Sequence, residues 1–205
     1  MKAKQIALIL IPLNIILAYF VYNSIDSEIK FQDLAKVRIA ENIQKLKDLR
    51  QVQIAYKKIN NTYADNFESL LDFLDNDSMS IVRAIGETPD SLTDSQALEL
   101  GIISRDTTFV AAKETIFDKA YLNSRNKDYP LDLNNLTKVP HSEKIYQVNA
   151  GIVEKGKVMV QVFEISTTYE SVFTGLDASN KSYELDNLLK VGSMDEASLN
   201  GNWGE

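Results

Sequence analysis

The side chains that could do chemistry are few and scattered in this chain of 205 residues. His141 is the only histidine, and it lies between Pro140 and Ser142 in a stretch that reads as a loop or a strand edge. No Gly-x-Ser-x-Gly turn is present to hold a nucleophile for it. We therefore expect His141 to be an exposed loop residue and not a general base.

Acidic side chains gather at Asp72, Asp75 and Asp77. Two carboxylates can act as an acid and a base in glycoside hydrolysis, and Asp75-Asn76-Asp77 is similar to the start of a calcium loop. The Gly and the closing Glu that such a loop needs at fixed offsets are missing. We expect solvated carboxylates at a helix end, with no catalytic residue, no metal site and no cofactor.

Composition narrows the function classes further. The chain has no Cys, which excludes disulfides, thiol catalysis and the usual zinc clusters. Its net charge is -7, and an acidic surface repels phosphates, so we expect no nucleic acid partner. Hydrophobic residues make up 44% and charged residues 25%, as in a globular protein that carries one membrane anchor.

An uncharged apolar run covers residues 6–22. At about 1.5 Å per residue it spans roughly 26 Å as a helix, and a membrane span needs about 17–25 residues. With Asn23 at the interface, the run predicts a cytoplasmic stub over 1–5 and a transmembrane helix over 6–23. A cleaved signal peptide is the alternative, but its apolar centre is shorter and is followed by small residues, whereas residues 19–23 are bulky.

Charges on either side of the run predict its orientation. Lys2 and Lys4 precede it, and Asp26 and Glu28 are the first charged residues after it. The positive-inside rule then places the N-terminus in the cytoplasm. The basic residues within 30–38 lie on the other side of the run and favour the opposite orientation.

Two residues interrupt the predicted span. Pro12 removes a backbone donor, and Asn14 places an amide near the middle of the membrane. One interpretation is helix association within the bilayer, for which Pro12, Asn14 and Tyr19 are the candidates. The other is a local bend in which the amide bonds to its own helix.

Residues 24–60 predict a helical stalk. From Ser27 onward there is no Gly or Pro, and helix formers dominate. The helix either continues from the span or bends at 23–24 or 31–32. Apolar residues recur at spacings of three and four and form one stripe: Ile39, Ile43, Leu46, Leu49, Val52, Tyr56 and Ile59. The stripe either packs on the chain's own sheet or pairs with a second copy or a partner, without the clean heptads of a coiled coil.

Residues 61–190 predict an extracytoplasmic α+β domain. A helix stop at 60–63 precedes a short amphipathic helix capped by Asp65 or Asn66. A second short helix is expected over 94–100, ending at Gly101, and 81–85 reads as a strand or a helical turn.

The strongest β signal is the alternating pair 144–153 and 158–165, joined by a turn with Gly156. Further strands are expected at 107–110 and 115–117, and a final helix at 183–189. We expect an antiparallel sheet of three to five strands to cover the stalk's stripe. In the polar tail over 191–205, Trp203 either tucks into its own domain or anchors a partner.

The layout resembles that of pilins and pseudopilins. An apolar N-terminal helix continues into an amphipathic one, and residues 49–56, then 61–63, then Phe67 and Leu70 are similar to the passage that follows the helix in those proteins. The resemblance implies a small antiparallel sheet packed on the helix. The processing site of that family is absent, so cleavage by a prepilin peptidase is not expected.

A second resemblance covers more of the chain. Residues 45–50 and 55–57, with the tail segments 189–194 and 202–203, are similar to a family of single-pass envelope proteins of Bacteroidota. This resemblance implies a compartment and an architecture, and it adds no site residues.

Together these patterns predict a non-enzymatic, single-pass structural subunit of a bacterial envelope assembly, such as a secretion, pilus-like or motility machine. We expect it in the inner membrane with most of the chain in the periplasm, in contact with lipid and with other envelope proteins or copies of itself. The alternatives are a membrane-tethered enzyme or ligand-binding domain acting on envelope polymers, and a protein of a phage or mobile element.

Overall fold

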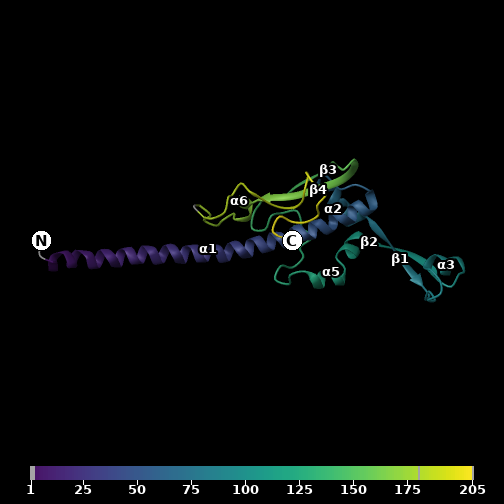
Figure 1. Ribbon diagram of the computed structural model, residues 1–205, viewed down its shortest axis with the longest axis horizontal. Coiled ribbons are helices and arrows are strands. Elements are labelled where there is room, and N and C mark those ends of the chain that lie inside the picture. The colour runs from purple at the N-terminus through teal and green to yellow at the C-terminus, as the bar shows by residue number, and fades with distance from the viewer. Residues whose placement is uncertain (1–2, 180, 205) are drawn as a thin grey trace.

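One helix, α1 (Ala3–Asn60), carries the rest of the molecule (Figure 1). In this computed structural model the helix has 58 residues and is continuous past Pro12, so neither of the alternative bends is observed. At about 1.5 Å per residue it is roughly 87 Å long. The structure describes residues 3–179 and 181–204, so Met1 and Lys2 of the predicted stub lie outside it.

Helix α1 ends where its sequence predicts. Asn61 adopts the left-handed conformation with φ 57°, and its N–H donates to Lys57 O at 2.9 Å, which is a helix-terminating turn. Helix α2 (Phe67–Asn76) then begins with Asn66 as its N-cap, whose side chain accepts from Ser69 N. Of the two cap candidates, Asn66 is therefore the one used.

A three-stranded antiparallel sheet lies along the C-terminal half of α1. Its strands are β3 (Gln147–Lys155), β4 (Val158–Thr168) and β5 (Leu188–Gly192), in the order β3-β4-β5. The β3–β4 turn is confirmed: Gly156 and Lys157 both have positive φ, as a two-residue hairpin turn of type I′ requires.

The final helix predicted over 183–189 is wrong. Residues 188–192 form β5, which pairs with the edge of β4. Leu189 and Val191 are both fully buried at a spacing of two, so the period of burial is that of a strand. The tail beyond β5 folds back, and Val191 bridges to Gly201, so the predicted tail is part of the domain.

A second sheet forms an arm, which we define as residues 78–111. Strands β1 (Ser78–Ile85) and β2 (Ser104–Ala111) pair antiparallel, and helix α3 (Asp94–Glu99) lies in the loop between them. The predicted short helix is thus confirmed, and it is followed by Gly101 at φ 71°. Figure 1 shows the arm projecting beyond the C-terminal end of α1.

Three short helices complete the fold: α4 (Ala112–Ile116), α5 (Lys119–Ser124) and α6 (Tyr169–Val172). The strand predicted over 115–117 is wrong, because Ala112 and Ile116 bury one face at helical spacing. The molecule is α+β, as predicted: a long apolar N-terminal helix followed by small antiparallel sheets.

The apolar stripe of α1 forms the centre of the core. Leu46, Leu49 and Val52 are at most 1% exposed, Ile39, Ile43 and Tyr56 are partly buried, and Ile59 is exposed. The core continues toward the N-terminus as far as Phe31, which packs against Phe173 and Tyr183. Of the two expected burials, the structure shows packing on the chain's own domain.

Candidate functional site

The face of α1 that meets the domain is polar as well as apolar. Asn42, Gln44, Asp48 and Gln53 are at most 8% exposed, and each is hydrogen-bonded. A buried polar group costs free energy unless it has a partner. The contacts of these four residues therefore determine which segment packs where along the helix.

Asp48 is the centre of a buried ionic contact. Arg125 donates to both of its carboxylate oxygens, from Nε at 2.8 Å and from Nη2 at 2.7 Å. Tyr121 Oη and Gln44 Nε2 also donate to Asp48. The hydrogen bond to Asp48 raises the pKa of Arg125 further, and burial raises the pKa of Tyr121, so both remain protonated donors.

Two other contacts attach the chain to α1 on either side of Asp48. Tyr146 Oη donates to Asn42 Oδ1 at 2.6 Å, and burial raises the pKa of Tyr146 well above its usual value. Gln53 makes two bonds to the backbone of Ala64, donating to its carbonyl and accepting from its N–H. The second contact holds the turn after α1 against the helix that it has just left.

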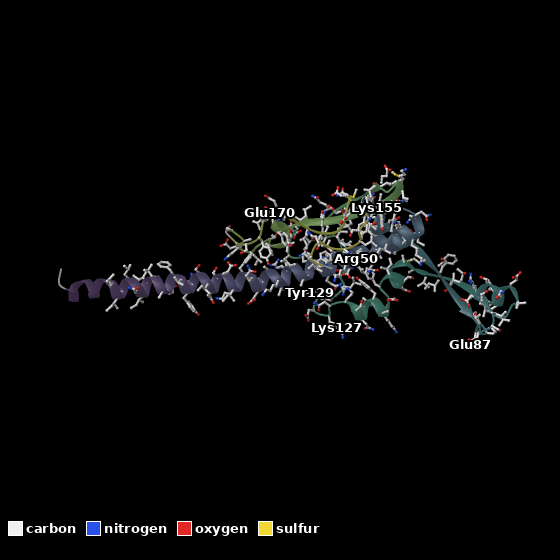
Figure 2. The ribbon with its side chains drawn as sticks, viewed as in Figure 1. Arg50, Glu87, Lys127, Tyr129, Lys155 and Glu170 are labelled. Atoms are coloured by element: carbon white, nitrogen blue, oxygen red, sulfur yellow. The ribbon has the colours of Figure 1, made fainter. Side chains whose placement is uncertain are left out.

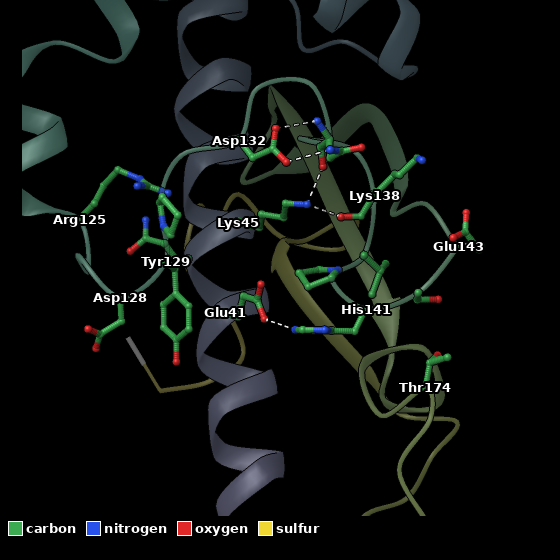
Figure 3. A pocket seen from close by; sticks show the side chains of 16 residues that line it. Glu41, Lys45, Arg125, Asp128, Tyr129, Asp132, Lys138, His141, Glu143 and Thr174 are labelled. Carbon is green, nitrogen blue, oxygen red and sulfur yellow. Dashed lines mark hydrogen bonds and ion pairs between the residues drawn. The ribbon is translucent and has the colours of Figure 1, made fainter.

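An open groove lies beside these contacts, between α1 and the segment over residues 125–143 (Figure 3). Its volume is about 610 Å³. Lys45 reaches across its floor and donates to the carbonyls of Asn135 at 2.5 Å and Lys138 at 2.7 Å. Burial lowers the pKa of Lys45, although nearby carboxylates such as Asp132 oppose this shift.

Three further titratable groups of the groove are engaged with the protein itself: Glu41, Asp132 and His141. His141 Nε2 lies 2.8 Å from Glu41 Oε2, and the His141 side chain is half exposed in a loop, as predicted. Asp132 accepts from the side chain and backbone of Asn135, and these bonds lower the pKa of Asp132. Figure 3 shows Glu41 and His141 pointing toward each other across the groove.

The arrangement does not bring the acidic candidates to His141. Asp72 and Asp75 lie on α2, away from the groove that His141 lines, and Asp72 accepts from Asn76 Nδ2 one turn along. Within residues 3–179 and 181–204, no group of three His, Asp or Glu side chains is placed to hold a metal ion. The groove is the open space beside the contact between α1 and residues 125–143.

The N-terminal part of α1 has a different environment. Over residues 10–22 every side chain is exposed, and α1 is the one described helix long and apolar enough to cross a membrane. Asn14 Nδ2 donates to Leu10 O at 2.8 Å, which is the local bond of the second interpretation. Pro12 and Tyr19 lie on the same exposed helix, and Tyr19 contacts Phe20 edge-on.

Trp203 is tucked into its own domain. It packs against the core, and its indole covers Gly201 so closely that a Cβ there would overlap the ring. Lys47 Nζ of α1 lies 6.0 Å from the ring centroid. The structure therefore shows the first of the two predicted roles of Trp203, a contact that fixes the tail on α1.

The apolar stripe of α1 does not by itself predict the buried polar residues, because it contains apolar residues alone. Asn42, Leu46, Leu49 and Gln53 follow each other at spacings of four, three and four, so the polar pair shares the buried face. That spacing was available in the sequence. The partners Arg125 and Tyr146 were not, since they are 77 and 104 residues away from the helix residues they bind.

Comparisons with family models, with curated proteins and with solved structures give no match for this chain. The resemblances to pilins and to Bacteroidota envelope proteins therefore stay predictions.

Proposed function

We propose that this protein is a non-enzymatic structural subunit of a bacterial envelope assembly, fastened to the inner membrane by α1. The observation that carries the proposal is that the same helix is both the candidate membrane span and the centre of the domain's core. No linker separates the two. A protein built this way holds its domain at a set height and in a set rotation relative to the bilayer.

The domain holds the helix close to the end of the apolar run. Lys181 Nζ lies 2.9 Å from Glu28 Oε2 and 5.4 Å from the ring centroid of Phe31. Glu28 is six residues beyond Tyr22, which corresponds to about 9 Å along a helix. A catalytic domain that searches for substrate gains from a flexible tether, whereas a scaffold needs this fixed geometry.

The orientation in the proposal comes from the charges around the span. Since the chain has no cysteine, single cysteines can report it directly. We expect an impermeant maleimide added to intact spheroplasts to label Lys127→Cys and to leave Ala3→Cys unlabelled. Labelling of Ala3→Cys alone would show that the chain has the opposite orientation in the membrane.

A membrane-tethered ligand-binding domain is the second candidate, and the groove beside Lys45 favours it. The groove is large enough for a small ligand. Glu41 pairs with His141, and Lys45 donates to backbone carbonyls, so these charges are already engaged and contribute less to binding a charged ligand. Loss of function in His141→Ala or Lys138→Ala, with the fold and the membrane contacts intact, would favour this candidate.

The test of the structural role is an uncoupling insertion. A Gly-Gly-Ser-Gly-Gly segment placed after Ser24 leaves both the span and the core intact but breaks the rigid connection. We expect the variant to remain in the membrane, to melt at an unchanged temperature and to lose the crosslinks that the parent chain forms in native membranes. Unchanged crosslinks in the variant, or no crosslinks in the parent, would contradict the structural role.

A further inference from the structure

The exposed apolar side chains beyond α1 gather on two surfaces. One is the arm, and the other is the free end of the β3–β4 hairpin, which we call the hairpin end and define as residues 152–159. Most of the large apolar side chains that are exposed in the described chain after residue 60 lie on them: Val82, Ile85, Leu98, Leu100, Ile102 and Phe109 on the arm, and Ile152, Val158 and Met159 on the hairpin end.

The arm has a negative net charge, with five Asp and Glu residues against Arg83 and Arg105, and it exposes several large apolar side chains. Val82 and Phe109 lie on the same face of the two-stranded sheet, at 56% and 75% exposure. Its loop over residues 86–103 carries four acidic residues and no Lys, Arg or His: Glu87, Asp90, Asp94 and Glu99. Contiguous exposed apolar residues with a polar rim are typical of a protein interaction site.

The hairpin end has the opposite net charge, because Lys155 and Lys157 outnumber Glu154, which is exposed and pairs with Met159. Lys155 precedes the turn and pairs with Val158, Lys157 is the second residue of the turn, and both lysines are exposed. Ile152 and Met159 share the sheet face that, further along β4, buries Phe163 against Tyr63 at a centroid distance of 4.7 Å. Helix α1 ends at Asn60, so the core face of the hairpin continues past the helix and loses its cover.

The two surfaces fit each other in chemistry and do not meet within one molecule. Figures 1 and 2 show the arm and the hairpin end as separate projections, with Glu87 and Lys155 at their tips. The chain as a whole has a net charge of -7, so most of its surface repels a second copy. Of these two exposed apolar surfaces, only the hairpin end has a positive net charge, so it attracts the acidic arm of a second copy.

We propose that the arm of one copy docks on the hairpin end of a second copy of this chain. The contact is heterologous, so each copy offers one free arm and one free hairpin end, and copies can add in series. The proposal rests on the proposed structural function and names its partner. The anchored helices keep neighbouring copies in one membrane, which raises their effective concentration for this contact.

Cysteine crosslinking of the full chain in lipid vesicles tests the contact, since the chain has no Cys of its own. One preparation carries Leu100→Cys, the other carries Met159→Cys, and a short bis-maleimide is added. We expect a crosslinked dimer when the two preparations share vesicles and only background levels with either one alone. A dimer with Leu100→Cys alone would replace the proposal with an arm-to-arm contact, and no dimer in any mixture would overturn it.

Charge exchange separates a specific contact from crowding. K155E/K157E in the Met159→Cys chain should lower the dimer yield by about tenfold, since like charges now face each other. E87K/D90K in the Leu100→Cys chain should restore the yield against it. K119E/K127E changes the net charge equally on another surface and should have no effect, and equal losses with both lysine pairs would overturn the proposal.

The same cysteine variants in native membranes distinguish self-docking from the proposed structural function. A crosslink from Leu100→Cys to a different protein, with no arm-to-hairpin dimer, would overturn self-docking and leave the structural role of the protein standing. The absence of every crosslink in the native membrane would contradict both self-docking and the structural role.

Discussion

At the scale of single residues, the protein is held together by polar side chains inside an apolar interface. Asp48 and Arg125 are 1% and 7% exposed, so each would be a buried charge without the other. Removing one member of such a pair leaves the other uncompensated, which is far more costly than the pair itself is stabilising. By contrast, Lys144 and Glu170 form an exposed pair with little effect on stability.

Arg125→Met should therefore lower the free energy of unfolding by about 3–5 kcal/mol, because Asp48 keeps its charge without its bidentate partner. Lys144→Ala, which breaks the exposed pair, should cost about 0–1 kcal/mol. Urea unfolding of both variants measures the difference. Equal losses would mean that the contact with Asp48 does not hold the 119–143 segment on α1.

Tyr146 makes the stability of the fold depend on pH in the alkaline range. Burial raises its pKa well above the ordinary value, so the folded protein keeps the proton that the unfolded chain begins to release near pH 10. The unfolded state then binds fewer protons than the folded one, and stability falls as pH rises above that point. Tyr146→Phe lacks this group, so its melting temperature should fall less steeply than that of the parent between about pH 9 and about pH 11. Parallel curves would show that Tyr146 is not the group responsible.

At the scale of elements, the sequence predicts what is local. The β3–β4 hairpin, α2, α3 and the end of α1 were predicted because their turns and caps lie within a few residues of each other. Strand β5 was missed because its period of two extends over five residues only and its pairing with β4 is a long-range event. The same holds for α4, where the apolar residues that suggested a strand occupy one face of a single helical turn.

The junction between β4 and β5 depends on one glycine. Gly192 has φ 77°, and a Cβ on it would overlap the carbonyl oxygen of Phe163 in the paired strand. Gly175 has a similar φ of 80° and open space around it. Both alanine variants carry the strain of the left-handed conformation, but only the one at Gly192 adds a clash.

Gly192→Ala should thus be less stable than Gly175→Ala by about 1–3 kcal/mol. Thermal melts of the two variants give the comparison, with the parent chain as reference. If Gly175→Ala were the more damaging variant, β5 could not lie as close to Phe163 as the structure places it.

At the scale of the whole molecule, the candidate span and the fold share one helix. Composition and hydropathy predict the span, and the spacing of apolar residues predicts that the helix continues. The sequence could not show which surface covers the stripe, because that surface is assembled from segments between residues 63 and 203. For the same reason the arm could not be foreseen: its exposure follows from where α1 ends.

The candidate site was the least predictable part. His141 was expected in a loop, and it is there, but the groove that it lines arises from Lys45 and the backbone of a segment about 90 residues away. Asp72 and Asp75 lie on α2, away from the groove. Their neighbours in the sequence do not supply the other groups that an active site needs.

The most direct test of this account is the intact mass of the protein recovered from carbonate-washed membranes. We expect the chain to stay in the membrane pellet with a mass that includes residues 6–22, since the helix that holds the domain together is also the proposed anchor. A soluble chain that begins after Tyr22 would contradict it.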